Sequence, residues 1–108
     1  MIRAKVFWDG KRLIGFDIKG HAEYAPHGED IVCSAVSMLA ITTVNSLLEQ
    51  VGQVLVKSDD GLVSVRLPDD FNEEQKLKAQ VILKTLLIGL NGVSMEYPKY
   101  VALENILN

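Results

Sequence analysis

The sequence predicts one α+β domain with two layers, built from two β-hairpins and two long helices in the order β-β-α-β-β-α, with a possible short last strand. Two observations carry this prediction. Asp-Gly dipeptides join two pairs of segments that are rich in strand formers, and each pair is followed by a longer segment with apolar residues at helical spacing. With 108 residues the chain has the size of one ordinary domain, so we expect residues 1–108 to form a single unit.

The first predicted hairpin joins residues 2–9 to residues 12–19. The turn falls at Asp9-Gly10, which supplies the positive backbone angles that a tight hairpin needs. Strict alternation in the second arm predicts that one face carries Ile14, Phe16 and Ile18. The second hairpin extends over residues 54–67, with its turn at Asp60-Gly61.

The first helix is expected over residues 31–51 and the second over about 72–91. Gly52 ends the first, whereas the second opens with acidic residues and ends at Gly92. Met38 and Ile41 lie off the main apolar stripe of the first helix, so we expect that helix to be covered on more than one side. Beyond Pro98, residues 99–104 could add a short edge strand.

Composition excludes several classes of function. The formal net charge is -3 and no long block of like charge occurs, which argues against direct nucleic-acid binding. The single cysteine, Cys33, excludes an internal disulfide framework and a Cys-rich zinc module, and it suits a reducing compartment. The N-terminus lacks the apolar core of a secretory signal, and polar residues interrupt the longest apolar stretches, so no membrane span is expected. We therefore expect a cytoplasmic protein.

Reactive side chains are concentrated in residues 20–37, which hold both histidines and the only cysteine. Asp30 is placed to cap the first helix, which puts Cys33 within the first helical turn. The N-terminal end of a helix favours a thiolate, and a nearby histidine cation would favour it further. His21 precedes the connecting loop, which is long enough to fold back and bring the imidazole to the thiol.

A Cys-His pair of this kind can perform nucleophilic catalysis, with backbone N–H groups of the first helical turn, including that of Cys33, as expected oxyanion donors. Spacing alone leaves an alternative open, because a free cysteine is often a small apolar filler and a loop histidine is often plain polar surface. Zinc is a second alternative, since the segment also supplies Glu23, His27 and Asp30 as donors. The spacing of these donors does not match a recognisable zinc motif, so we expect no metal or other cofactor.

Three neighbours of the pair are candidates for supporting roles. Asp30 could orient His21, but capping the helix is the commoner use of an aspartate at this position. Ser37 lies one turn beyond Cys33 and could steady the sulfur or the imidazole, or bond to its own helix backbone. Gly20 could serve as the hinge of a gating loop, although turn geometry alone could also demand glycine there.

Two short motifs in this segment resemble the bacterial ribosomal-processing cysteine protease family, known as Prp. They are Gly20-His21-Ala22 and Asp30-Ile31-Val32-Cys33-Ser34-Ala35-Val36-Ser37. The length and the order of elements match that family as well. The resemblance implies a Cys-His endopeptidase with His21 and Cys33 at the catalytic positions. It also implies a homodimer and a substrate in the N-terminal extension of a large-subunit ribosomal protein. A non-enzymatic ribosome-assembly partner is the rival class, and Met38, Ile41 and the apolar flanks of both helices would fit its docking surface. A dimer interface accounts for the same residues more economically.

Overall fold

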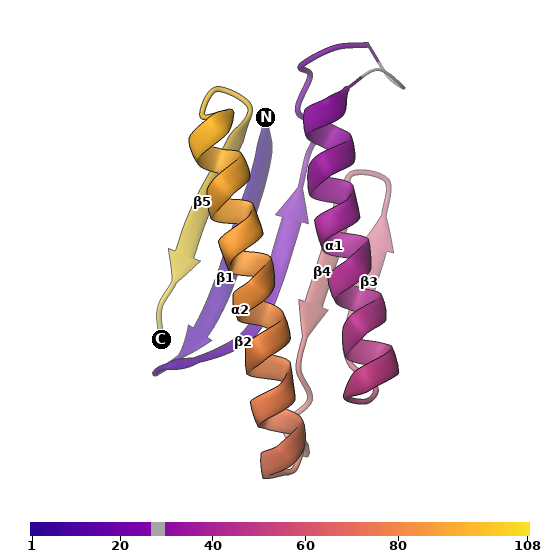
Figure 1. Ribbon diagram of the computed structural model, residues 1–108, viewed down its shortest axis with the longest axis vertical. Helices are drawn as coiled ribbons and strands as arrows, with labels where there is room; N and C mark the ends of the chain where they lie inside the picture. The colour runs from indigo at the N-terminus through magenta and orange to yellow at the C-terminus, as the bar shows by residue number, and fades with distance from the viewer. Residues whose placement is uncertain (27–29) are drawn as a thin grey trace.

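The fold is a five-stranded sheet with two helices on one of its faces (Figure 1). The computed structural model describes residues 1–26 and 30–108. The predicted class, an α+β domain with two layers, is confirmed. The elements are, in chain order, β1 (Ile2–Asp9), β2 (Arg12–Lys19), α1 (Ile31–Gln50), β3 (Leu55–Asp59), β4 (Leu62–Arg66), α2 (Glu73–Glu96) and β5 (Val101–Ile106).

The strand order in the sheet is β3-β4-β2-β1-β5. Both predicted hairpins are present, and β2 joins them by pairing antiparallel with β4. The expected short last strand is confirmed as β5, which lies parallel to β1 at one edge. The other edge is β3, whose residues are all exposed. The pairing of β2 with β4 places the end of β2 beside the turn between β3 and β4. The candidate site lies at this end of the sheet.

A β-bulge interrupts the alternation predicted for β2. Phe7 lies opposite Gly15 but Trp8 lies opposite Leu13, so Ile14 is an extra residue in the pairing. The bulge turns Leu13 into the core with Phe16 and leaves Ile14 only partly buried, and the expected place of Ile14 is therefore wrong. The Gln80 side chain exchanges hydrogen bonds of 2.8 and 2.7 Å with the backbone N–H and carbonyl of Leu13, which ties the bulge to α2.

The core lies between the sheet and the inner sides of the two helices, where side chains from both layers are almost fully buried. From α1 it takes Val32, Val36, Ala40 and Leu47, and from α2 Ala79, Leu83, Leu86 and Leu90. Burial of this apolar area provides most of the driving force for folding. The outer side of α1 is different, because Met38 is 60% exposed and Ile41 is 49% exposed. The expectation that α1 is covered on more than one side holds for the sheet and for α2, where Leu39 lies against Gly89, but this cover does not reach Met38 and Ile41.

By length and composition α1 could cross a membrane, since its mean hydropathy reaches 1.9 over a window that is 28% buried. This corrects the expectation that no segment is apolar enough. Ser, Thr and Asn interrupt the helix but lower its hydropathy far less than charges would, and Glu49 is the charged residue of α1. The buried side of α1 gives a simpler reason for its composition, because that side forms the core against the sheet.

The second helix begins as predicted and ends later than predicted. Asn72 and Gln75 form a reciprocal capping box at its start, followed by acids in the first turn. Gly92 does not end the helix, which continues to Glu96. Val93, the next residue, packs against the core from this last part of the helix. The helix ends at Glu96, and Tyr97 leaves the helical region directly before Pro98, as steric conflict with a following proline favours.

Candidate active site

Cys33 lies in the first turn of α1, and Asp30 is the residue that caps this turn. The Cys33 backbone N–H donates to Oδ1 of Asp30 at 2.9 Å, and the Asp30 backbone is extended as in an ordinary N-cap. The Cys33 side chain is partly buried. The cap therefore fixes the backbone that carries the thiol at the end of the helix where the dipole is positive.

The other carboxylate oxygen of Asp30 holds the loop that leads from β2 to α1. Tyr24 donates its backbone N–H to Oδ2 of Asp30 at 3.0 Å. Burial works against the charged form of Asp30, but hydrogen bonds from backbone N–H groups, that of Cys33 first, outweigh it and lower the pKa of this carboxyl. Asp30 is therefore a buried carboxylate whose hydrogen bonds join the loop to the helix.

Aromatic contacts anchor the same loop to the opposite end of the chain. The Tyr24 ring meets the rings of Tyr97 and Tyr100 edge to face, with centroids 5.7 and 5.1 Å apart. Both partners belong to the connection between α2 and β5. The loop on the His21 side of the site is thus held by the cap of α1 and by this aromatic cluster.

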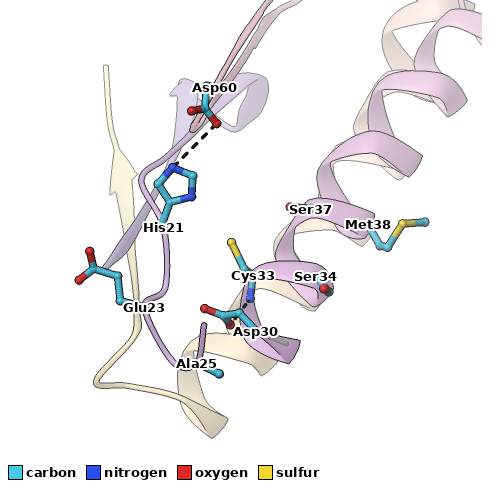
Figure 2. A pocket seen from close by; sticks show the side chains of 9 residues that line it. All are labelled: His21, Glu23, Ala25, Asp30, Cys33, Ser34, Ser37, Met38 and Asp60. Atoms are coloured by element: carbon cyan, nitrogen blue, oxygen red, sulfur yellow. Dashed lines mark hydrogen bonds and ion pairs between the residues drawn. The ribbon is translucent and has the colours of Figure 1, made fainter. Parts of the chain in front are cut away.

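His21 follows the end of β2 and lies against the turn between β3 and β4. The backbone N–H of Gly20 donates to the carbonyl of Gly61 at 2.8 Å, which fixes the backbone just before His21. A Cβ atom on Gly61 would lie 3.0 Å from Nε2 of His21, so the imidazole rests directly on this glycine. Nε2 of His21 also lies 4.0 Å from Oδ1 of Asp60 in the same turn, as Figure 2 shows.

The side chains of His21 and Cys33 line one open groove of about 640 Å³ (Figure 2). The imidazole comes from the loop after β2 and the thiol from α1, and both point into the space between these segments. Other residues of the groove are Glu23, Ala25, Asp30, Ser34, Ser37, Met38 and Asp60. Because His21 is exposed and Cys33 is half-buried, a bound peptide could reach both groups.

The structure brings His21, Cys33 and Ser37 to one groove, which Asp30 also lines. Asp30 makes the expected cap, and a carboxylate that lies beside His21, 4.0 Å from Nε2, belongs to Asp60. The Cys33 N–H is engaged by Asp30, so the expectation that it serves as an oxyanion donor is not supported in this conformation.

The zinc alternative rests partly on His27, which together with residues 28 and 29 lies outside the described residues. Among residues 1–26 and 30–108, no group of three or more His, Cys, Asp and Glu side chains is arranged to hold a metal ion. Gly20 has a positive φ of 98°, and a Cβ there would lie 2.5 Å from the carbonyl oxygen of Met1. This close approach gives glycine a static role at the start of the loop, and the hinge stays a prediction.

The contribution of the turn between β3 and β4 escaped the sequence analysis. Asp60 and Gly61 were read only as a hairpin turn, because they lie far along the chain from the reactive segment. The signal that could have found them is the pairing of the two hairpins, which brings this turn to the end of β2. Met38 was also assigned elsewhere, to an interface, yet it lies one turn beyond Ser34 at the rim of the groove.

A thiol at the start of a helix, opposite an imidazole across an open groove, is the arrangement of a thiol hydrolase. Comparison with known proteins makes the class specific, because the model of the family described as cysteine protease Prp matches residues 1–102. The chain therefore belongs to the Prp family of cysteine proteases.

Individual relatives agree with this membership. The chain is 27% identical over 90 residues to the ribosomal processing cysteine protease Prp of Bacillus subtilis, covering 81% of this chain and 80% of that protein. It is 30% identical over 87 residues to the protein of that name from Staphylococcus aureus, covering 78% of each. The crystal structure of the S. aureus ribosomal processing protease Prp with a covalently linked product peptide is similar with a TM-score of 0.86 and 28% identity, over 97% of this chain and 99% of that one.

Proposed function

We propose that this cysteine protease removes a short N-terminal extension from a large-subunit ribosomal protein, with Cys33 as nucleophile and His21 as general base and acid. The observation that carries the proposal is the groove of Figure 2, in which the thiol of a capped helix start and an imidazole share one accessible space. The ribosomal substrate is supported by the names of the relatives, which describe ribosomal processing.

In the proposed mechanism His21 takes the proton of the Cys33 thiol, and the sulfur attacks the carbonyl carbon of the scissile peptide bond. A carbon–sulfur bond forms and the carbon–nitrogen bond breaks as His21 returns the proton to the leaving amine. A water molecule, deprotonated by His21, then attacks the thioester and releases the carboxylic acid product. The thiol regains its proton, so the cycle needs no cofactor.

The helix start supports this chemistry electrostatically. The dipole of α1 favours negative charge near the sulfur, which lies in the first turn of the helix. The charge of Asp30 lies at the same end, but its two oxygens are bound by backbone N–H groups and it is nearly fully buried. Asp30 therefore acts through position, by holding the turn that carries Cys33.

The direct experiment is incubation of the protein with the N-terminal peptide of its own organism's large-subunit ribosomal proteins, with the cut located by mass spectrometry. We expect one cut that leaves a shortened mature N-terminus. Cys33→Ala should abolish the cut. Cleavage of every unfolded polypeptide at equal rates would contradict a processing role, and cleavage by Cys33→Ala would contradict the mechanism.

We also propose that the protein acts as a homodimer in the cytoplasm, where a free thiol stays reduced. The support is the outer side of α2, which carries four exposed apolar residues at helical spacing, Leu77, Val81, Ile88 and Met95. A second copy could cover such a stripe in an isologous contact. Light scattering should give the mass of two chains, and Ile88→Glu should give that of one. A monomeric wild-type protein would contradict this part of the proposal.

A further inference from the structure

The loop between β2 and α1 contains a strained residue that lines the active-site groove. Glu23 has a φ of 58°, the one positive φ of a residue other than glycine in the part of the chain that the structure describes. A side chain makes this left-handed conformation unfavourable, so it persists where the surrounding structure holds the backbone firmly. Glu23 and Ala25 both line the groove that holds His21 and Cys33 (Figure 2). The conformation of Glu23 therefore shapes one wall of that groove.

The residues on either side of Glu23 are each held in place. Ala22 is 2% exposed and belongs to the core. Tyr24 donates its backbone N–H to Oδ2 of Asp30 at 3.0 Å, which fixes the loop to the start of α1. This bond involves the backbone of Tyr24 alone, so the Tyr24 side chain is free to make a second contact.

The Tyr24 ring makes that contact with the connection between α2 and β5. It meets the rings of Tyr97 and Tyr100 edge to face, with centroids 5.7 and 5.1 Å away. In Figure 1 this connection and the loop after β2 lie at the same end of the molecule. Edge-to-face packing depends on the charge distribution of aromatic rings, so an aliphatic side chain of similar size would not reproduce it.

The two partner rings belong to backbone that is itself fixed. Tyr97 donates its backbone N–H to the carbonyl of Val93 in the last turn of α2, at 2.8 Å. The carbonyl of Tyr100 accepts from the N–H of Ile2 at the start of β1, also at 2.8 Å. Both tyrosine side chains are partly buried against the core. The aromatic cluster therefore joins the loop to α2 and to β1.

We propose that Tyr24, Tyr97 and Tyr100 are positioning residues of the protease. Their rings hold the backbone of Glu23 in its left-handed conformation and so keep one wall of the groove in the shape that binds a peptide. The proposal rests on the proposed function of the groove and deepens it. It also gives a role to residues near the end of the chain, for which the sequence indicated no function.

The two reacting groups have supports of their own. The bond from Gly20 to Gly61 fixes the backbone before His21, and the Asp30 cap fixes that of Cys33. Neither bond involves a tyrosine ring. Loss of a ring should therefore raise KM and leave kcat nearly unchanged, which is the result expected for an interaction that supports the bound substrate and the transition state equally.

The test compares Tyr24→Leu with Tyr24→Phe, because phenylalanine keeps the ring and leucine removes it. Tyr24 is 42% exposed, so neither change should unfold the protein. With the ribosomal peptide, Tyr24→Leu should raise KM by about tenfold and keep kcat within about twofold of the wild type, since two aromatic pairs are lost. Tyr24→Phe should keep the wild-type KM. Tyr97→Leu should reproduce the rise in KM from the other side of the cluster.

Trp8→Leu is the matched control for the loss of an aromatic ring. Trp8 is partly buried against the core at the far end of β1, where it lies opposite Leu13 near the first hairpin turn. This variant should lose stability and keep the wild-type KM. A rise in KM equal to that of Tyr24→Leu would mean that KM follows the stability of the whole domain, and it would overturn the proposal.

Amide hydrogen exchange measured by NMR separates the cluster from the protease function, because it needs no substrate. The backbone N–H of residue 24 should exchange about tenfold faster in Tyr24→Leu and Tyr97→Leu than in the wild type, and at the wild-type rate in Tyr24→Phe. The N–H of Gly20, which is bonded to Gly61, should exchange at the wild-type rate in all three variants.

The outcomes distinguish the two claims. If the wild-type protein cuts no peptide, the proposed function fails, and hydrogen exchange still decides whether the rings hold the loop. Unchanged exchange at residue 24 in both leucine variants would overturn the proposal. A kcat that falls at constant KM in Tyr24→Leu, or a Tyr24→Phe variant that behaves like Tyr24→Leu, would overturn it as well.

Discussion

The backbone N–H of Gly20 donates to the carbonyl of Gly61 at 2.8 Å and thereby joins the two hairpins directly beside the reactive groove. This bond fixes the residue before His21 to the turn on which the imidazole rests. Cys33 comes from a different element, held by the Asp30 cap. The site is therefore assembled from the loop after β2, the turn between β3 and β4, and the start of α1. Gly20, Gly61 and the Asp30 carboxylate, in that order, take part in the contacts that position these segments.

The first prediction concerns the two side chains that we propose as nucleophile and base. Cys33→Ala and His21→Ala should each reduce peptide cleavage to background while leaving thermal unfolding close to that of the wild type, because His21 is exposed and Cys33 lies at the rim of the core. The assay is cleavage of the ribosomal peptide, with circular dichroism to check the fold. Substantial activity in either folded variant would refute the pair.

The second prediction concerns metal ions. Cleavage should persist after treatment with a chelator, because the proposed mechanism takes its nucleophile and its proton transfers from side chains. Elemental analysis of the purified protein provides an independent measurement. Zinc bound at one ion per chain, together with loss of activity on its removal, would favour the metal alternative.

The third prediction concerns Asp30 and pH. Its pKa is lowered in the folded protein, since backbone hydrogen bonds outweigh the effect of burial, so the native state favours the charged form. Its contribution to stability is present above the ordinary carboxyl pKa of 3.8 and is lost as pH falls through the lower folded pKa. Asp30→Asn should be less stable than the wild type near neutral pH, and the difference should shrink in acid. Unfolding by urea across this pH range measures both.

The same substitution tests the role of Asp30 in catalysis. Asparagine has one acceptor oxygen, so it can keep the bond from Cys33 or the bond from Tyr24 but not both. We expect a modest fall in kcat/KM, because the cap largely survives the exchange. A loss as large as that of His21→Ala would show instead that the charge of Asp30 orients the base.

The sequence was sufficient for the elements and for the reactive segment, because both depend on local patterns. Asp-Gly turns, helical spacing and the aspartate before Cys33 are readable within a few residues of one another. The face on which Ile14 lies could not be predicted, because a bulge shifts the register without a local mark. Gly92 does not end the second helix, because helix packing outweighs the intrinsic cost of a glycine inside a helix. Asp60 and Gly61 escaped because their place beside His21 depends on which strands pair.

The fourth prediction concerns Gly20, which sequence analysis proposed as a hinge. A side chain at this positive φ is strained, and a Cβ would lie 2.5 Å from the carbonyl oxygen of Met1, a backbone atom that cannot easily move. Gly20→Ala should therefore lower both thermal stability and kcat/KM, and it should change the rate at which iodoacetamide reaches Cys33. Wild-type cleavage and alkylation rates in this variant would show that the loop is a static wall.

The last prediction separates positioning of His21 from backbone strain, and the chain offers a matched pair of glycines for it. Gly10 and Gly61 both follow Asp in hairpin turns, with φ of 60° and 73°. Alanine at either position should lower the free energy of unfolding by about 1 to 2 kcal/mol, because a residue with a Cβ atom is strained in the left-handed region. At Gly10 the added Cβ meets nothing within 4 Å, whereas at Gly61 it presses on Nε2 of His21.

Gly10→Ala should consequently lose stability and keep its kcat, while Gly61→Ala should lose similar stability and also lose kcat, because the imidazole is displaced from the thiol. The measurement is kcat and KM for the ribosomal peptide, with urea unfolding of both variants. The pH profile of kcat should change in Gly61→Ala alone, since the surroundings of the base change there. Equal kcat in the two variants would mean that the turn between β3 and β4 does not position His21, and that its closeness to the imidazole has no part in catalysis.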